Sequence, residues 1–144
     1  MASGMQELFD MMARQAKNAE LNGNGMIVLG ELYNQLLEMP AEAILAVEFY
    51  GVPICAGDLF SYRGYYEDLS FDLEGQTTVT EVLERIDDLL AGESYEGYKG
   101  GEYYAHYNTL VWVSQYGDNS GIGVSGVELV GDKVFLTTVD TNDR

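Results

Sequence analysis

Hydrophobic residues change their spacing several times along this chain, and the order of these changes limits the folds it can adopt. From Ser3 to Glu20 they recur every three or four positions, which is typical of an amphipathic helix. Ser3 and Gln6 have the spacing of a capping box, and the glycines and asparagines of residues 22–25 predict the helix end. The hydrophobic stripe of this helix comprises Met5, Leu8, Phe9, Met12, Ala16 and Ala19.

Two further segments have the same helical spacing. One of them carries several leucines after Val28 and ends at Met39 and Pro40, because proline cannot continue a helix. The other begins at Thr78, which forms a predicted capping box with Glu81, and ends at Gly92. The chain is therefore expected to contain three helices.

Strands are predicted between and after these helices. Residues 43–50 have β character and end at the Gly-Val-Pro of residues 51–53, and residues 69–74 alternate between a hydrophobic and an acidic face. Residues 109–115 form another strand. Residues 121–130 and 133–139 form a hairpin closed by Gly131 and Asp132, with a bulge at Gly126.

This order predicts the α+β class, with a mainly antiparallel sheet of about five strands and two to three helices packed on one side. A length of 144 residues fits a single domain covering residues 1–144. Residues 1–22 form an N-terminal helix that packs either on this domain or on another subunit.

Eight of the 11 tyrosines lie between Tyr62 and Tyr107, in two runs that also contain glycine and one cation each. Tyrosine supplies a flat apolar face and a hydroxyl, glycine allows close backbone approach, and the cation can bind an anion. The second run has no period and is expected to be an ordered loop. The candidate ligand-binding residues are Tyr62, Arg63, Tyr65, Tyr98, Lys99, Gly100, Gly101 and Tyr103, with Trp112 either beneath the pocket or, as we favour, in the core.

A structural explanation of the same residues remains open. Arg63 and Lys99 have acidic neighbours with which they could pair, and the tyrosines could pack as core. Loops rich in tyrosine and glycine are also typical of protein-binding surfaces. The neighbouring acids are Glu67, Asp68, Glu96 and Glu102.

The charge excludes most nucleic-acid binding, because 24 acidic residues against seven basic ones give a net charge of -17. This acidity serves either solubility or attraction to a basic partner. The single histidine, His106, and the single cysteine, Cys55, leave no zinc motif, and the acids form no calcium loop. Cys55 is read as a small buried hydrophobe. No serine lies in a nucleophile elbow, so we expect neither an enzyme, a metal nor a cofactor.

Compartment is predicted from what the sequence lacks. It contains no apolar run of the roughly 20 residues that a membrane helix needs. The N-terminus has neither the basic start nor the apolar centre of a secretory signal. A cytoplasmic location with no membrane partner is expected.

Between about Gly30 and Gly123, the order of motifs resembles a family of small bacteriophage-encoded accessory proteins of largely uncharacterised role. The motifs are Leu-Leu-Glu-Met-Pro ending at Pro40, Ser-Tyr-Arg-Gly-Tyr-Tyr-Glu-Asp-Leu ending at Leu69, Thr-Val-Thr-Glu-Val-Leu from Thr78, Gly-Tyr-Lys-Gly-Gly-Glu-Tyr ending at Tyr103, and Val-Trp-Val-Ser-Gln-Tyr-Gly ending at Gly117. The resemblance implies a phage protein acting in the host cytoplasm and supplies no catalytic residues.

These observations predict a non-enzymatic phage counter-defence protein that sequesters an anionic, nucleotide-like ligand between its tyrosine runs. Homo-oligomerisation through the first helix fits the same view. The alternative is an acidic, DNA-mimic-like inhibitor of a basic host defence protein, such as a nuclease or a CRISPR effector complex. Its working carboxylates would be Glu67, Asp68, Asp72, Glu74, Asp87 and Asp88.

Overall fold

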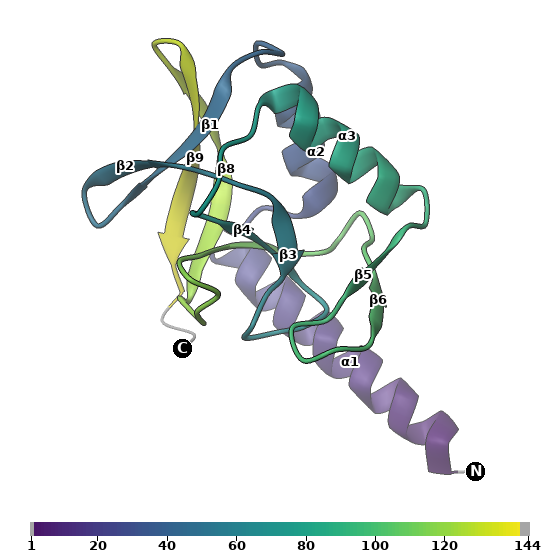
Figure 1. The fold of residues 1–144 in the computed structure, drawn as a ribbon. Coiled ribbons are helices and arrows are strands. Elements are labelled where there is room, and N and C mark those ends of the chain that lie inside the picture. Colours follow the sequence, from purple (N-terminus) through teal and green to yellow (C-terminus); the bar gives the residue numbers. More distant parts are fainter. Residues whose placement is uncertain (1, 142–144) are drawn as a thin grey trace.

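The computed structural model describes the backbone of residues 2–141 and the side chains of residues 8–141 (Figure 1). Its described part contains three helices, α1 (Ala2–Gly23), α2 (Leu29–Leu37) and α3 (Val79–Leu90). The strands are β1 (Ile44–Phe49), β2 (Val52–Cys55), β3 (Leu59–Ser61), β4 (Leu69–Asp72), β5 (Ser94–Glu96), β6 (Glu102–Tyr104), β7 (Val111–Ser114), β8 (Ile122–Val130) and β9 (Lys133–Asp140).

The main sheet is mostly antiparallel, which confirms the predicted α+β class, but it has seven strands in place of about five. Their order is β2-β1-β9-β8-β7-β4-β3. Two neighbouring pairs, β1 with β9 and β4 with β7, run parallel, whereas the other neighbours run antiparallel. The last strand of the chain therefore lies inside the sheet, between β1 and β8.

The prediction missed both edge strands, β2 and β3. Tyr50 and Gly51 have φ angles of 51° and 80°, so the chain reverses in a tight turn and continues as β2 where a break was expected. Pro53 lies in β2, which is an edge strand, a position where a missing N–H group is tolerated. Cys55, expected to be buried, is only half-buried there.

The second tyrosine run also differs from its prediction. It forms a separate two-stranded hairpin, β5 with β6, in place of an irregular loop. Only three residue pairs connect the strands, so the hairpin is too short to have a recognisable hydrophobic period. The expected hairpin of β8 and β9 is confirmed, and its register shifts between Val124 and Gly126, where a bulge was predicted.

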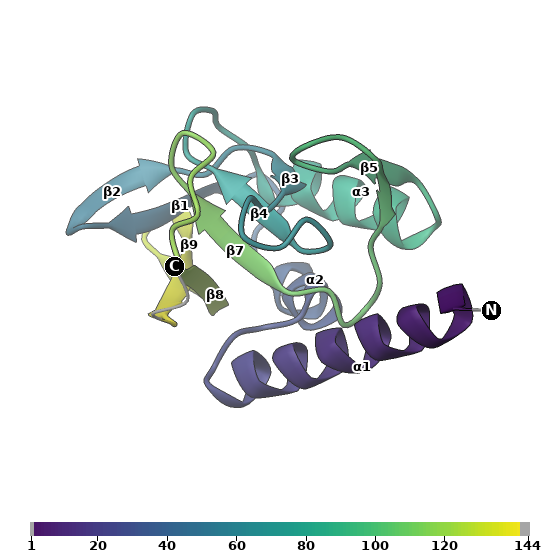
Figure 2. The ribbon, with the colours of Figure 1, turned by 90° about the horizontal axis from the view of Figure 1, so that it is seen from below.

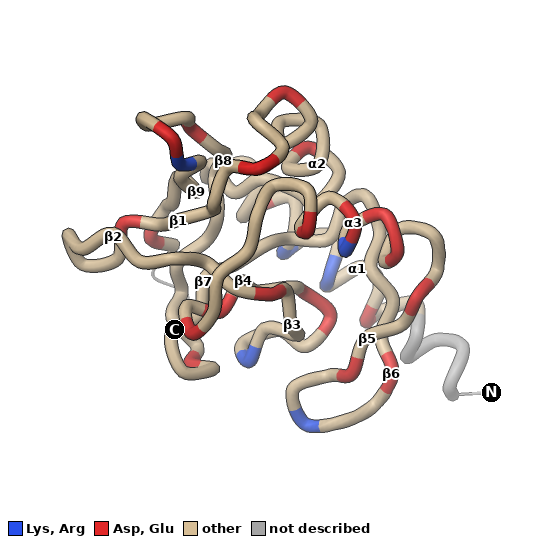
Figure 3. The backbone as a smooth tube through the Cα atoms, turned by 45° about the horizontal axis from the view of Figure 1, so that its top comes forward, with Lys and Arg blue, Asp and Glu red and all other residues tan. Residues whose placement is uncertain are grey.

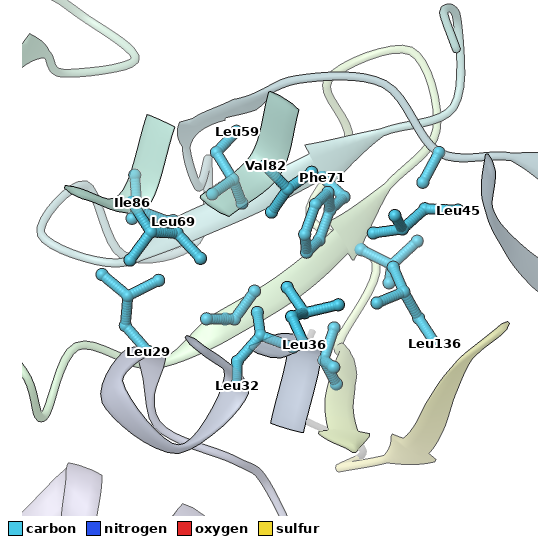
Figure 4. Close-up of a cluster of buried hydrophobic side chains, with 14 of the residues drawn as sticks. Leu29, Leu32, Leu36, Leu45, Leu59, Leu69, Phe71, Val82, Ile86 and Leu136 are labelled. Atoms are coloured by element: carbon cyan, nitrogen blue, oxygen red, sulfur yellow. The ribbon is translucent and has the colours of Figure 1, made fainter. Parts of the chain in front are cut away.

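The larger hydrophobic core lies between the sheet and the helices α2 and α3 (Figure 4). Val111 and Val113 of β7 point into it, together with Leu69 and Phe71 of β4. The acidic side predicted for residues 69–74 is confirmed only in part, because Ser70 is buried on that side, whereas Asp72 is half-buried and Glu74 is exposed. The labelled core side chains in Figure 4 are Leu29, Leu32, Leu36, Leu45, Leu59, Leu69, Phe71, Val82, Ile86 and Leu136.

A second cluster lies on the other side of β7, where Trp112 points away from Val111 and Val113. Among the described side chains of helix α1, Leu21 near the C-terminal end is the one that belongs to this cluster. The helices are thus not all on one side: α2 and α3 share the larger core, and α1 contacts the smaller one. The full cluster consists of Leu21, Met26, Val28, Tyr62, Leu110 and Trp112.

The capping box predicted at the start of α3 is confirmed. The Thr78 hydroxyl accepts a hydrogen bond from the Glu81 N–H group at 3.2 Å, and the Glu81 carboxylate accepts one from the Thr78 N–H group at 3.3 Å. The capping box at Ser3 and Gln6 involves side chains outside the described residues.

We predict that Thr78→Ala lowers the free energy of unfolding by about 1 kcal/mol, because the first turn of α3 loses its side-chain acceptor. Urea denaturation followed by circular dichroism measures this change. Thr78→Ser is the matched control, since it retains the hydroxyl. Equal stability of the Ala and Ser variants would contradict a role for the cap.

Candidate functional site

The two tyrosine runs meet in space, which sequence spacing alone does not show. The backbone N–H group of Tyr98 donates a hydrogen bond to Ser61 Oγ at 3.0 Å. The Tyr95 hydroxyl donates to the Glu67 carbonyl oxygen at 2.7 Å, and the rings of Tyr66 and Tyr98 stack with centroids 6.4 Å apart. The β5–β6 hairpin is therefore joined to the loop between β3 and β4.

A cavity of about 740 Å³ lies where the hairpin, the edge strand β3 and helix α3 come together. This volume is in the range of small-molecule binding pockets. Arg63 and Tyr98, one from each run, both line it, and the Arg63 guanidinium carbon lies 5.6 Å from the Tyr98 ring centroid. The lining residues whose side chains could contact a ligand include Ser61, Arg63, Asp72, Arg85, Glu93 and Tyr98.

Buried serines contribute hydroxyl groups to this cavity. Ser70 Oγ donates to Ser114 Oγ at 2.6 Å, and Ser114 Oγ donates to the Asp118 carbonyl oxygen at 3.1 Å. Ser61 Oγ donates to the Tyr66 carbonyl oxygen at 2.8 Å in addition to accepting from Tyr98. These bonds orient the hydroxyls and hold the first tyrosine loop against the sheet.

Both signs of charge line the cavity. Its cations are Arg63 and Arg85, and the Arg85 guanidinium lies 3.7 Å from the Glu93 carboxylate. Sequence reasoning missed Arg85, because an arginine between acids on a helix looks like part of a solvated face. Arg85 lies 22 residues after Arg63 in the sequence, so no local motif indicates that the two residues share a site. The carboxylates are Asp72, Glu74, Glu93 and Glu96.

Tyr62 is a core residue in the structure, although it was a candidate for ligand stacking. Its side chain is 0% exposed, and its ring stacks on Trp112 with centroids 4.4 Å apart and planes within 5°. The hydroxyl donates to Asn119 Oδ1 at 2.8 Å and accepts from the Gly121 N–H group at 2.9 Å. A ligand therefore cannot reach this ring. Trp112 is likewise fully buried, as favoured from the sequence.

Tyr65 and Tyr103 are half-buried outside the 740 Å³ cavity. The Tyr65 ring centroid lies 3.9 Å from Lys17 Nζ, so this ring packs against helix α1. The Tyr103 ring stacks on Tyr95 at 6.1 Å and lines a different cavity of about 580 Å³ beside α1. His106 lines that second cavity too.

Lys99, Gly100 and Gly101 form the tip of the β5–β6 hairpin, away from the lining of the larger cavity. Both glycines have positive φ, 95° and 86°, as the reversal of the chain requires. The Gly100 N–H group donates to the Gly97 carbonyl oxygen at 2.9 Å, so the turn already uses this donor. Lys99 is exposed, and of the candidate cations only Arg63 reaches the cavity.

The acids beside Arg63 pair with a different cation. Lys17 Nζ lies 2.9 Å from Asp68 Oδ2 and 3.0 Å from Glu67 Oε1. Asp68 Oδ2 also accepts a hydrogen bond from Trp112 Nε1 at 2.9 Å. Within the described side chains, neither Arg63 nor Lys99 forms an ion pair, so the pairing considered from the sequence is not observed.

Burial raises the pKa of Asp68 from 3.8 to about 6, although Lys17 and the indole of Trp112 favour the charged form. The carboxyl is 1% exposed, so its loss of hydration is the largest effect. Burial also raises the pKa of Tyr95, whose hydroxyl remains the donor to Glu67.

We predict that Asp68→Asn changes how stability depends on pH. Folded Asp68 binds a proton more tightly than the unfolded chain, so its contribution to stability is complete below pH 3.8 and is lost as pH rises through about 6. Relative to Asp68→Asn, the wild type should lose about 2 kcal/mol of unfolding free energy between pH 4 and pH 7. Urea denaturation across this range measures the difference.

Asp88→Asn, on the exposed side of α3, is the control and should keep the wild-type pH dependence. Parallel pH curves for the wild type and Asp68→Asn would show that the buried carboxyl does not titrate with a raised pKa.

Among the described residues, no group of three or more His, Cys, Asp or Glu side chains is placed to hold a metal ion. None of the helices in residues 2–141 combines the length and apolar character that a membrane crossing needs. Comparison with known proteins gives no relative: no protein-family model, no curated protein and no solved structure matches the chain.

Proposed function

We propose that this protein is a non-enzymatic binding protein that sequesters an anionic, nucleotide-like ligand in the cavity between its tyrosine runs. The observation that carries the proposal is the meeting of Arg63 and Tyr98 in the lining of one cavity of about 740 Å³. Arg63 belongs to the first tyrosine run and Tyr98 to the second. Each run contains one isolated cation among tyrosines and glycines. The ligand residues assigned by the proposal are Ser61, Arg63, Arg85 and Tyr98, with Lys99, Gly100 and Gly101 left out.

Two arginines give the cavity its means of binding a phosphate. A guanidinium group can donate two parallel hydrogen bonds to phosphate oxygens, and its charge strengthens both. Tyr98 is 44% exposed, so a ligand that enters the cavity can contact this aromatic side chain. Its backbone is held by Ser61, which keeps the ring beside Arg63.

The carboxylates of the cavity restrict the ligand further. Four of them face two arginines, so a highly charged anion would be repelled. Carboxylates accept hydrogen bonds well, and a ribose hydroxyl or an amino group of a base is a suitable donor. These groups favour a nucleotide with one or two phosphates over a triphosphate.

Binding without chemistry is favoured by the kinds of residue in the lining. It contains no histidine, lysine or cysteine. Three of its four serine hydroxyls, at positions 61, 70 and 114, donate to hydroxyl or carbonyl oxygens, whereas the fourth, Ser94, donates to the Glu102 carboxylate at 2.8 Å. A serine without an adjacent base is a weak nucleophile. We propose that this sequestration takes place in an infected bacterial cell, as the motif resemblance to phage accessory proteins implies, and that it removes a host-defence signal.

We predict that native mass spectrometry of protein purified from infected bacterial cells detects a bound species of a few hundred daltons. Arg63→Ala should remove it, because a charge-assisted hydrogen bond contributes about 1.5–3 kcal/mol, or at least tenfold in affinity. Thermal shift with the four nucleoside monophosphates gives a second measurement on purified protein.

Lys99→Ala is the matched control, because it removes the same charge from the hairpin tip outside the cavity. The proposal fails if the Arg63 and Lys99 variants retain the bound species equally, or if the wild type carries none and responds to none of the four nucleotides.

The acidic inhibitor remains a second candidate because Glu84, Asp87 and Asp88 of α3 are exposed. Figure 3 marks the acidic residues of this helix in red. Glu67 and Asp68 no longer belong to its working set, since both bind Lys17 and Asp68 is buried. Charge reversal of Glu84, Asp87 and Asp88 to lysine should then abolish binding to a basic host protein, while Arg63→Ala should leave it intact. Such binding should weaken steeply as salt is added.

A further inference from the structure

Helix α1 packs on the domain with its polar face, whereas an amphipathic helix normally packs with its hydrophobic face. Lys17, Asn18 and Leu21 contact the body: Lys17 binds Asp68, Asn18 Nδ2 lies 3.5 Å from the Asn108 carbonyl oxygen, and Leu21 is buried. The hydrophobic side chains are exposed instead, with Leu8 at 48%, Phe9 at 55% and Met12 at 54%. The polar side of the helix is therefore the side that the domain covers.

The helical period explains this inversion. Met12 and Leu21 are nine residues apart, which is about two and a half turns, so they lie on opposite sides of α1. Ala16 and Ala19 are also exposed and lie on the same outward side as Met12. We call the described residues Leu8, Phe9, Met12, Ala16 and Ala19 the outer stripe.

An outward stripe of this length marks an interaction surface, since soluble proteins rarely leave a continuous apolar patch uncovered. It does not belong to the ligand cavity, whose lining contains no α1 residue. The N-terminal half of α1 also projects past the rest of the molecule in two perpendicular views (Figures 1 and 2), so a partner can reach the stripe without meeting the sheet.

We infer that the outer stripe binds the outer stripe of a second copy of this chain, with the two α1 helices antiparallel and the two-fold axis at Met12. In this arrangement one pair of stripe residues is complementary in size. A two-fold axis at position 12 places Leu8 of one copy opposite Ala16 of the other, because 8 and 16 are equally distant from 12. A large side chain thus meets a small one at this pair, once on each side of the axis, while Met12 meets Met12 of the other copy and Phe9 meets Gln15.

Charge also selects a second copy at this surface. Helix α1 contains three acids (Glu7, Asp10 and Glu20) and two bases (Arg14 and Lys17), for a net charge of -1, whereas the remaining chain carries -16 of the total -17. Two such acidic molecules repel each other least where their α1 helices meet. A basic partner would gain little electrostatic attraction there. A net charge of -1 also does not resemble the cationic face of a membrane-binding helix.

Sedimentation velocity of the full chain between about 2 and 200 µM tests this inference. The wild type should change from 15.9 kDa to twice that mass, and added salt should favour the dimer by screening the net charge. Met12→Glu should keep the protein monomeric, because the axis would bring two carboxylates together. Leu129→Glu, at an apolar position exposed on β8, is the matched control and should still dimerise.

Cross-linking tests the direction of the helices in a Cys55→Ser background. A mixture of Leu8→Cys and Ala16→Cys chains should form a disulfide-linked dimer under mild oxidation, whereas Leu8→Cys alone should not. Linking of Leu8→Cys chains to each other would overturn the antiparallel arrangement.

A wild type that stays monomeric at every concentration, or whose α1 instead binds vesicles of anionic lipid, would overturn the inference as a whole. The test is independent of the nucleotide proposal, since all variants leave Arg63 and Tyr98 in place.

Discussion

The buried carboxylate of Asp68 is the interaction on which this structure depends. It joins three parts of the chain that are distant in sequence: Lys17 in α1, the loop between β3 and β4, and Trp112 in β7. An isolated charge in such a position is costly, so the Lys17 ammonium and the indole N–H group are needed to stabilise it. Helix α1 is therefore attached to the domain through this polar contact and through Leu21, and its outer stripe remains exposed.

The same contact positions the candidate site. Trp112 stacks on Tyr62, and the Tyr62 hydroxyl connects to Asn119 and Gly121 beyond β7. Tyr62, which precedes Arg63, is held by these contacts. Arg63 therefore extends from a fixed backbone position toward Tyr98. Rigid support of this kind lowers the entropy lost when a ligand is bound. The buried tyrosine thus serves the cavity indirectly, by holding the backbone next to the arginine.

Local patterns predicted local structure well here. The capping box of Thr78 and Glu81 and the turn at Gly131 and Asp132 depend on residues a few positions apart, and both were found where expected. Contacts between residues far apart in the sequence were not indicated by any local pattern. Tyr62 and Tyr98 look alike in sequence, yet only the first meets Trp112 and is buried. Lys17 and Arg85 were not recognised, because their partners are set by the folded chain.

The position of β9 has a consequence for how the molecule is made. This strand follows all the other strands in the sequence, yet it lies between β1 and β8 and joins the β2-β1 pair to the rest of the sheet. Until it is synthesised, the first hairpin has no neighbour on its inner edge, and pairing residues 44–47 with 133–136 closes a very long loop. The sheet can therefore be completed only after β9 has been synthesised, and nascent chains would expose an unpaired strand edge until then.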